Sequence, residues 1–293
     1  MPELPEVQAL VADLRARLIG RTIGRVDVTA FSALKTYDPP PAVFAGAAFT
    51  AVDRHGKFLD LTAEGPETGG TPVHLVVHLA RAGWIRWRDN APSPGAGRGK
   101  GPIAARLVLD DGSGFDITEA GTKKSLAVYV VREPQEVPGI ARLGPDPLEP
   151  GFTVDVLAGI LKQAGRSQLK GVLRNQATIA GIGNAYSDEI LHVAKMSPFK
   201  PAAMTADEVE VLYDAMQTTL RDAVARADGV SASELKAEKK SGLRVHGRNG
   251  EPCPVCGDTV RQVIFSDSTF QYCPTCQTGG KPLADRVLSR LLK

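Results

Sequence analysis

Residues 253–276 read CPVCGDTVRQVIFSDSTFQYCPTC and hold all four cysteines of the chain, arranged as two CxxC pairs separated by sixteen residues. Each CxxC pair lets two thiolates bind one ion, and two such pairs on a β-hairpin complete a tetrahedral site. We therefore predict one structural Zn²⁺ ion, with no open coordination position for catalysis, held by Cys253, Cys256, Cys273 and Cys276. Disulfides or a redox-active dithiol are the alternative, which a reducing compartment disfavours.

The segment before the cysteines is polar from Ser231 to Gly242 and then basic, reading Arg244-Val-His246-Gly-Arg248. A zinc hairpin preceded by such a segment is a common way to present basic side chains to phosphates. Enzymes and transcription factors both use this arrangement, so it does not define the function.

Apolar residues at helical spacing dominate the middle of the chain. The strongest helix is expected from Ala206 to about Arg226, where Thr205 and Glu208 have the spacing of a capping box. Three shorter helices are expected at Val154–Ala164, Ser167–Arg174 and Ala185–Ala194.

A glycine-rich turn, Ile179-Ala-Gly-Ile-Gly-Asn184, comes immediately before the third of these short helices. Gly181 and Gly183 permit close backbone approach, and the start of a helix offers backbone N–H groups to an anion. Asn184 either caps this helix or donates a hydrogen bond to a phosphate.

The first 131 residues have a different pattern, separated from the helices by the proline-containing connector Leu143–Leu148 (LGPDPL). Short apolar runs bounded by Gly, Pro and Asp predict a β-sandwich or barrel. The runs are Phe49–Val52, Phe58–Leu61, Val73–His78, Trp84–Trp87, Ala105–Leu109 and Leu126–Val131. Residues 90–102 (NAPSPGAGRGKGP) are typical of an exposed loop.

The N-terminus reads Met1-Pro2-Glu3-Leu-Pro-Glu6 and places a potential nucleophile at the end of the chain. Removal of Met1 would leave Pro2 with a secondary amine, whose pKa near ~8 provides a neutral fraction that can attack a carbonyl carbon. Glu3 and Glu6 are suited to moving protons around such a nucleophile. The alternative is an ordinary acidic first turn of the helix that the apolar spacing from residue 7 to 18 predicts.

Length and composition place the chain among globular proteins with two or more domains: it has 293 residues, 43% of them hydrophobic, and a net charge of +2. This charge alone implies no polyanionic partner. No apolar run approaches the ~20 residues of a membrane span, and the acidic start lacks an export signal. We therefore expect a cytoplasmic protein that does not contact membranes. We also expect a monomer, because the sequence has no heptad pattern or obvious interface signal.

Taken together, these motifs resemble one family, that of formamidopyrimidine-DNA glycosylase and endonuclease VIII. The matching segments are PELPEV at 2–7, Arg54-His-Gly-Lys57, LGPDPL, Lys170 with Ile182-Gly-Asn184, and Val245–Arg248 with the two CxxC pairs. The resemblance implies an α+β fold with an N-terminal helix and β-sandwich, a helix–two-turn–helix domain and a zinc-finger β-hairpin. The implied divisions are a catalytic domain at 1–131, a linker at 132–150, a DNA-binding domain at 151–235 and the zinc finger with its tail at 236–293.

The resemblance also implies a base-excision-repair glycosylase that cleaves the strand at abasic sites. Pro2 would attack C1′ of the damaged nucleotide and form an iminium, Glu3 would protonate the sugar ring oxygen, and Glu6 would position Glu3. Lys57 would supply positive charge near the phosphate and the transition state. The nucleotide must leave the base stack for this reaction.

The partner implied by the resemblance is double-stranded DNA with damaged bases or abasic sites, bound at the nucleoid. Lys170 and Asn184 would hold the flanking phosphates, and Arg248 would add a basic contact from the zinc finger. The chain departs from the family where side chains fill the vacated stack: Arg81 occupies the position of an apolar wedge, and the second loop carries Lys123 and Lys124 without a phenylalanine.

In the zinc hairpin, Ser268 lies where the family has a phosphate-binding arginine, and Arg261 is the nearest candidate substitute. These departures concern the choice of lesion and leave the Pro2 chemistry intact. Beyond Cys276, apolar residues from 283 to 291 suggest a small helix.

Two other readings remain from different classes of protein. A catalytically silent binder of damaged DNA would retain the fold and the finger, but it would need neither Pro2, Glu3 nor Lys57. A zinc-hairpin transcription factor would leave the first 130 residues unexplained.

Overall fold

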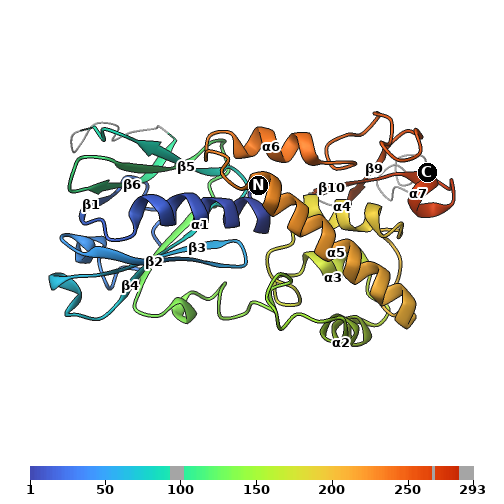
Figure 1. Ribbon diagram of the computed structural model, residues 1–293, viewed down its shortest axis with the longest axis horizontal. Coiled ribbons are helices and arrows are strands. Elements are labelled where there is room, and N and C mark those ends of the chain that lie inside the picture. Colours follow the sequence, from blue (N-terminus) through green and yellow to red (C-terminus); the bar gives the residue numbers. More distant parts are fainter. Residues whose placement is uncertain (93–101, 266–267, 284–293) are drawn as a thin grey trace. The chain divides into compact units, whose positions relative to one another are not determined.

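The computed structural model describes residues 1–92, 102–265 and 268–283 (Figure 1). The chain divides into two compact units. The first unit comprises Met1–Arg142 and Ala227–Lys236, and the second comprises Leu143–Arg226 and Ala237–Lys293. Most of the loop expected at 90–102 and the C-terminal helix expected at 283–291 lie outside the described residues.

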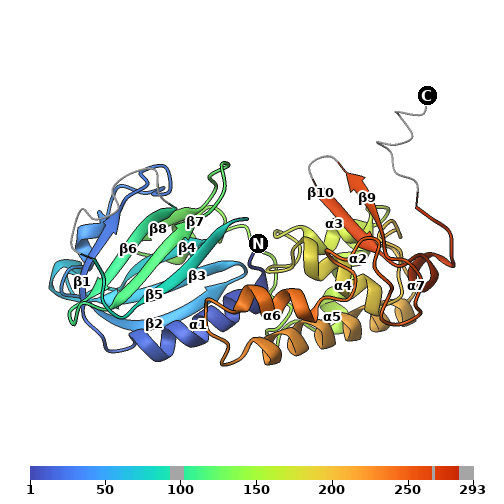
Figure 2. The same cartoon turned by 90° about the horizontal axis from the view of Figure 1, so that it is seen from above.

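The first unit is a β-sandwich with an N-terminal helix, as predicted. Helix α1 (Leu4–Leu18) runs alongside β2 (Figure 2). One antiparallel sheet has the order β1 (Ile23–Val28), β6 (Ile103–Leu109), β7 (Gly114–Glu119), β5 (Gly83–Arg88). The other has the order β2 (Ala48–His55), β3 (Phe58–Glu64), β4 (Val73–His78), β8 (Ala127–Val131). Short 3₁₀ turns occur at Pro41–Phe44, Pro66–Thr68 and Pro134–Glu136.

A single apolar core joins α1 to the inner faces of both sheets. Leu10 and Leu14 of α1 contribute to it together with Leu61 from one sheet and Phe115 from the other, all at most 1% exposed. At about 25 cal/mol per Å² of apolar surface buried, such residues supply most of the stabilisation. The helix that follows the N-terminal proline is therefore fixed by its apolar face.

Strands β1 and β7 were absent from the sequence-based prediction. β7 reads GFDITE, and all six of its residues are buried despite three polar side chains. The Asp116 carboxylate accepts hydrogen bonds from Arg106 Nε at 2.6 Å and from Arg88 Nε at 3.0 Å. These partners lie on neighbouring strands, so the sequence pattern of β7 alone does not reveal that its polar residues can be buried.

Residues 227–236 pack with the first unit, although the family resemblance implied a DNA-binding domain at 151–235. The Trp84 indole Nε1 donates to the Ala232 carbonyl at 2.5 Å, and Leu235 is fully buried in the first core. Helix α6 (Leu235–Gly242) follows, within the polar stretch for which no helix was predicted. Its sequence LKAEKKSG has too few apolar residues to show a helical period.

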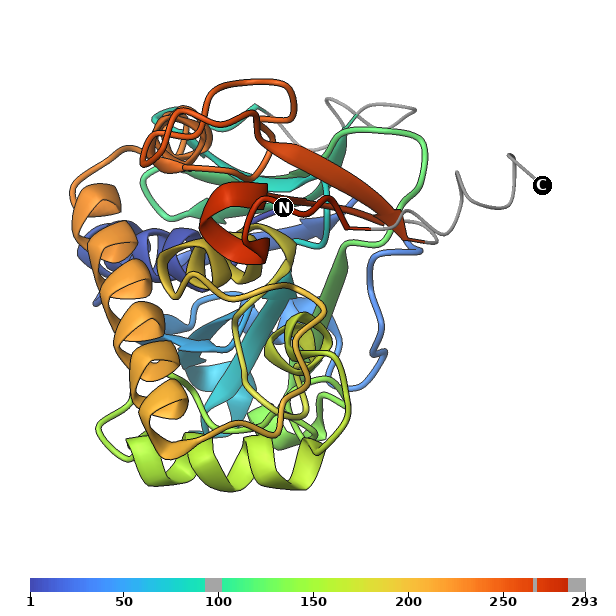
Figure 3. The same ribbon diagram turned by 90° about the vertical axis from the view of Figure 1, so that its right-hand side faces the viewer.

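The second unit is helical with a two-stranded hairpin. Its elements are α2 (Val154–Ala164), α3 (Leu169–Arg174), α4 (Asn184–Val193), α5 (Ala206–Ala227), α6, β9 (Arg261–Phe265), β10 (Ser268–Tyr272) and α7 (Pro274–Thr278). Figure 3 shows the long α5 and the shorter α2 on the outside of this unit. The bounds of α2 agree with the prediction.

The predicted capping box at the start of α5 is confirmed. Thr205 N donates to Glu208 Oε2 at 3.1 Å, and Glu208 N donates to Thr205 Oγ1 at 3.4 Å. The apolar stripe of α5, including Leu212, Met216 and Leu220, is buried in the core of the second unit. None of the described helices combines the length and the apolar character that a membrane crossing requires.

Candidate functional site

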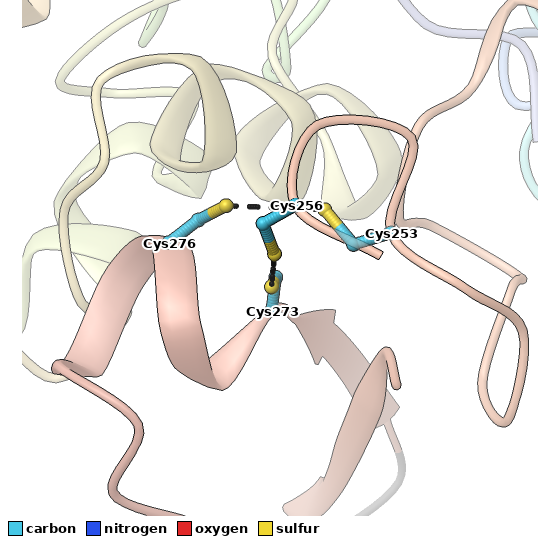
Figure 4. A group of neighbouring side chains, drawn as sticks. All are labelled: Cys253, Cys256, Cys273 and Cys276. Carbon is cyan, nitrogen blue, oxygen red and sulfur yellow. Dashed lines mark hydrogen bonds between the residues drawn. The ribbon is translucent and has the colours of Figure 1, made fainter. Parts of the chain in front are cut away.

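The four cysteines converge at one point of the second unit. Their Sγ atoms all lie within 4.8 Å of one another (Figure 4). The Sγ atoms of Cys253 and Cys276 are 3.9 Å apart, and those of Cys256 and Cys273 are 3.3 Å apart. These separations exceed the ~2.05 Å of a disulfide bond, whereas four converging thiols suit tetrahedral zinc. The site therefore holds a structural Zn²⁺, as predicted.

Glu189 of helix α4 binds the zinc ribbon, the segment from Arg244 to Thr278 that carries the four cysteines. One of its carboxylate oxygens accepts from the backbone N–H of Val245 at 3.0 Å and of His246 at 2.8 Å, and the other accepts from Arg244 N–H at 2.7 Å. Burial raises the pKa of this carboxyl, while the three N–H donors oppose the shift. The backbone of the basic segment predicted at 244–248 is thus fixed against α4.

The neighbouring Asp188 joins the ribbon to Lys170. The Asp188 carboxylate accepts from Lys170 Nζ at 2.6 Å and from Gln271 N at 3.2 Å, and lies 2.7 Å from His246 Nδ1. Lys170 is 5% exposed, and its ammonium also donates to Ser187 Oγ at 2.7 Å. Direct contact between Lys170 and a phosphate would require the ammonium to leave these partners.

Asn184 is the first residue of α4, and Gly183 occupies the N-cap position without a side-chain cap. The alternative in which Asn184 caps this helix is therefore wrong. Its Nδ2 instead donates to the Thr269 carbonyl on β10 at 2.7 Å. Its Oδ1 is buried and has no hydrogen-bond partner within the described part of the chain. The Gly181 φ of +85° allows the tight turn before the helix.

The N-terminal segment of the first unit places Pro2 beside two buried carboxylates. Pro2 is buried, Glu3 is 2% exposed and Glu6 is 1% exposed. Glu6 Oε2 accepts a hydrogen bond from the Glu3 backbone N–H at 2.8 Å. The initiator Met1 is 46% exposed. The carboxylate of Glu6 thus orients the peptide unit that joins Pro2 to Glu3.

Lys57 lies in the two-residue connection between β2 and β3, beyond the pair His55 and Phe58. The Arg54 guanidinium donates to the Gly56 carbonyl at 3.1 Å and to Gln8 Oε1 of α1 at 2.9 Å. Arg54 therefore links the turn that carries Lys57 to helix α1. Lys57 itself is only 7% exposed.

The Lys57 turn also faces the end of β4, where Phe58 pairs with His78. The ring centroids of Phe58 and His78 are 4.7 Å apart. Burial, and then the positive charge of Lys57, lower the pKa of His78 to about 4. His78 is therefore neutral at pH 7, which avoids a second positive charge beside Lys57.

A histidine–aspartate cluster, which no sequence pattern indicated, supports this turn. The Asp60 carboxylate is 3.0 Å from His55 Nε2 and 2.9 Å from His74 Nδ1. Burial raises the pKa of Asp60, but the hydrogen bonds and the charges of His55 and His74 together lower it by more, so it lies below its usual range. Burial lowers the pKa of His74, but the hydrogen bond to Asp60 and the negative charges of Asp60, Glu133 and Asp53 together raise it by more. The spacing of 55, 60 and 74 gave no signal, because the contacts depend on the register of three strands.

Replacing Asp60 by asparagine is expected to destabilise the first unit by about 1–3 kcal/mol and to change its pH profile. The lowered pKa of Asp60 stabilises the fold above ~pH 3.9, and the raised pKa of His74 stabilises it below ~pH 6.5. The first contribution is lost as the pH falls through the folded pKa of Asp60, and the second as it rises through that of His74. Thermal melts from pH 3 to 8 should show both limbs of this profile in wild type and in the control Asp13→Asn, which changes a half-buried carboxylate paired with Arg17. The profile should be flatter in Asp60→Asn. Equal profiles would contradict this assignment.

A tight turn after β4 presents Arg81. Gly83 N donates to the Leu79 carbonyl at 2.8 Å, and a Cβ on Gly83 would lie 2.1 Å from that oxygen. Ala80 adopts a φ of +51°, a left-handed conformation that is uncommon for alanine. Arg81 is exposed at the tip of this turn.

The loop after β7 carries Lys123 and Lys124, both exposed, and lies against the Arg81 turn. Ala120 N donates to the Ala82 carbonyl at 3.1 Å, which joins the two segments. Glu119 Oε1 accepts from the backbone N–H of Ser125 at 2.7 Å and holds the far end of the loop. The structure therefore brings these cations together on adjacent segments.

The two remaining predicted contacts lie in the second unit. Arg248 is partly exposed, and its Nε donates to Glu251 Oε2 at 2.7 Å. Arg261 is exposed at the start of β9, opposite Tyr272 of β10. Neither lies in the network that joins α4 to the ribbon.

Three family models match successive parts of the chain. They describe the formamidopyrimidine-DNA glycosylase N-terminal domain (residues 1–121), the formamidopyrimidine-DNA glycosylase H2TH domain (143–234) and the zinc finger found in FPG and IleRS (250–279). The formamidopyrimidine-DNA glycosylase of Symbiobacterium thermophilum is 37% identical over 291 residues, covering 94% of this chain and 89% of that protein.

Solved structures agree with these matches. The crystal structure of the formamidopyrimidine-DNA glycosylase of Thermus thermophilus has a TM-score of 0.78 at 31% identity and covers 96% of this chain and 100% of that chain. The Lactococcus lactis enzyme, bound non-covalently to DNA with an abasic site, shares the fold with a TM-score of 0.79 at 23% identity, covering 94% of this chain and 99% of that one.

Fold, zinc ribbon and relatives together define a DNA glycosylase of base-excision repair. The chain belongs to the formamidopyrimidine-DNA glycosylase and endonuclease VIII family.

Proposed function

We propose that the protein is a bifunctional enzyme that removes a damaged base and then cleaves the strand through the amine of Pro2. The observation that carries this proposal is the buried N-terminal arrangement of Pro2, Glu3 and Glu6. Glu6 also holds the start of α1 through the Glu3 backbone N–H, but a protein that only binds DNA needs no secondary amine beside two carboxylates that are at most 2% exposed. The silent binder therefore remains only as an outcome of the tests below.

The chemistry follows from the terminal amine once Met1 is removed. The Pro2 nitrogen lone pair forms a bond to C1′ as the bond from C1′ to the base breaks, and the proton that the amine loses neutralises the departing base. Glu3 donates a proton to the ring oxygen, the sugar opens, and the nitrogen and C1′ share an iminium double bond. The iminium acidifies C2′, so loss of a proton there expels the 3′ phosphate by β-elimination. Lys57 stabilises the negative charge of the phosphate that develops nearby.

The proposed substrate is double-stranded DNA with a damaged base or an abasic site. Arg81, Lys123 and Lys124 provide exposed positive charge from adjacent segments of the first unit, suited to the strands on either side of an extruded nucleotide. In the second unit, Asn184, Arg248 and Arg261 are the proposed phosphate contacts.

We propose a different role for Lys170, which is buried, than for these surface residues. Its ammonium donates to the Asn184 carbonyl at 3.1 Å, at the first residue of α4. We infer that Lys170 acts on the phosphate through Asn184, by fixing the start of the helix, and not by direct contact.

Single-turnover nicking of a duplex with one abasic site tests the proposal. Lys57→Met retains a long side chain and removes the charge, so we expect a rate about 10²-fold below wild type at saturating enzyme. Lys124→Met is the matched control, because loss of an exposed cation should weaken binding and leave the saturated rate unchanged. A wild-type protein that binds the duplex without nicking it would support the silent binder, and a Lys57→Met rate within twofold of wild type would contradict the role of Lys57.

A further inference from the structure

A histidine outside the proposed active site and DNA contacts faces the zinc cysteines. His192, in the last turn of α4, is 2% exposed. Its Nε2 lies 3.3 Å from Cys253 Sγ, within the distance of a hydrogen bond to sulfur. Its Nδ1 is buried and has no hydrogen-bond partner among the residues that the structure describes.

The chemistry of the two atoms sets the direction of this bond. A zinc-bound cysteine is a thiolate and can only accept a hydrogen bond. The ring nitrogen that faces it must therefore carry the proton, which selects the tautomer with hydrogen on Nε2. Four thiolates around one Zn²⁺ carry a net charge of −2, so a donor to one sulfur relieves an excess of negative charge in a buried place.

We propose that His192 is a positioning residue of the zinc centre, which donates its Nε2 hydrogen to the Cys253 thiolate and slows the loss of zinc. Cys253 is 3% exposed, and the contact from His192 reaches it from a different segment of the chain. Hydrogen bonds to metal ligands from such neighbouring groups orient the ligand and tune its electron density. The ligand that bonds to His192 is thereby a weaker nucleophile than the exposed Cys256.

The contact also completes the attachment of α4 to the ribbon. At the start of the helix, Asn184 binds Thr269. Near the middle of the helix, Asp188 and Glu189 bind the backbone of the ribbon. At the end of the helix, His192 contacts Cys253. The zinc centre and the start of α4 are thus held by one helix.

The test uses full-length, zinc-loaded protein and compares His192→Phe with Tyr186→Phe, a buried aromatic control on the same helix. Phenylalanine fills the space of the imidazole ring and removes the donor. We expect zinc transfer to an excess of a chelating dye to be about tenfold faster in His192→Phe and unchanged in the control. Cobalt-substituted His192→Phe should have its sulfur-to-metal charge-transfer band at lower energy, because the sulfur becomes more electron-rich.

Equal release rates within twofold and equal band positions in wild type and His192→Phe would overturn the proposal. If His192→Phe does not fold, ¹⁵N-histidine NMR of the wild-type zinc protein gives the answer without a variant. A proton on Nε2 of His192 supports the hydrogen bond to sulfur, and a proton on Nδ1 contradicts it.

Discussion

Glu3→Gln should excise a damaged base about 10² to 10⁴-fold more slowly than wild type under single-turnover conditions. The substitution retains size and hydrogen bonding but removes the proton that the ring oxygen needs as the sugar opens. Glu3 is 2% exposed and lies beside Pro2 in the chain, so water is poorly placed to replace it. Duplex affinity and the thermal midpoint should change little.

A matched control separates this role from a structural one. Glu133→Gln changes an exposed carboxylate in the same local setting, because the Glu133 backbone N–H donates to Glu136 Oε1 at 2.9 Å as the Glu3 N–H donates to Glu6. It should excise at the wild-type rate. Wild-type excision by Glu3→Gln, measured on a duplex with an intact damaged base, would remove Glu3 from the mechanism.

Loss of the zinc ion is expected to have the second large effect, on DNA binding. Structural zinc contributes about 10–16 kcal/mol to folding in isolated zinc-finger peptides at pH 7. Cys273→Ala should therefore unfold the ribbon and release its bonds to Asp188 and Asn184. The proposed DNA contacts of Arg248 and Arg261 would then be lost. At about 1.5–3 kcal/mol for each charge-assisted contact, this loss predicts an affinity for DNA that is lower by about 10²-fold or more.

The first unit has its own core and should retain its thermal transition in Cys273→Ala. Chelation of zinc from wild type should reproduce the loss of affinity, and added Zn²⁺ should restore it. Metal-free protein that binds the abasic duplex with wild-type affinity would show that the ribbon is dispensable for binding.

Local patterns in the sequence predicted much of this fold. The bounds of α2, the capping box of Thr205 and Glu208, and the four cysteines of the zinc site all depend on residues close together in the chain. Strand β7 was missed because the charge of Asp116 is balanced by arginines on other strands. Helix α6 was missed because its sequence is mostly polar.

In the candidate site, too, local motifs could be predicted, whereas contacts between distant segments could not. Motifs identified Pro2, Glu3 and Lys57 as candidates, but no pattern showed that Arg54 joins the Lys57 turn to α1. Nor did the sequence show that Lys170 forms an ion pair with Asp188. Both facts depend on contacts between elements that are distant in the chain, which the period of apolar residues does not encode.

Borohydride trapping tests the central claim most directly. Protein from which Met1 has been removed, as shown by its mass, is mixed with a duplex containing one abasic site and reduced. The account predicts a covalent protein–DNA adduct whose modified peptide begins at Pro2, and no adduct with protein that retains Met1. No adduct from the processed protein, or an adduct on a lysine, would contradict the use of Pro2 as the nucleophile.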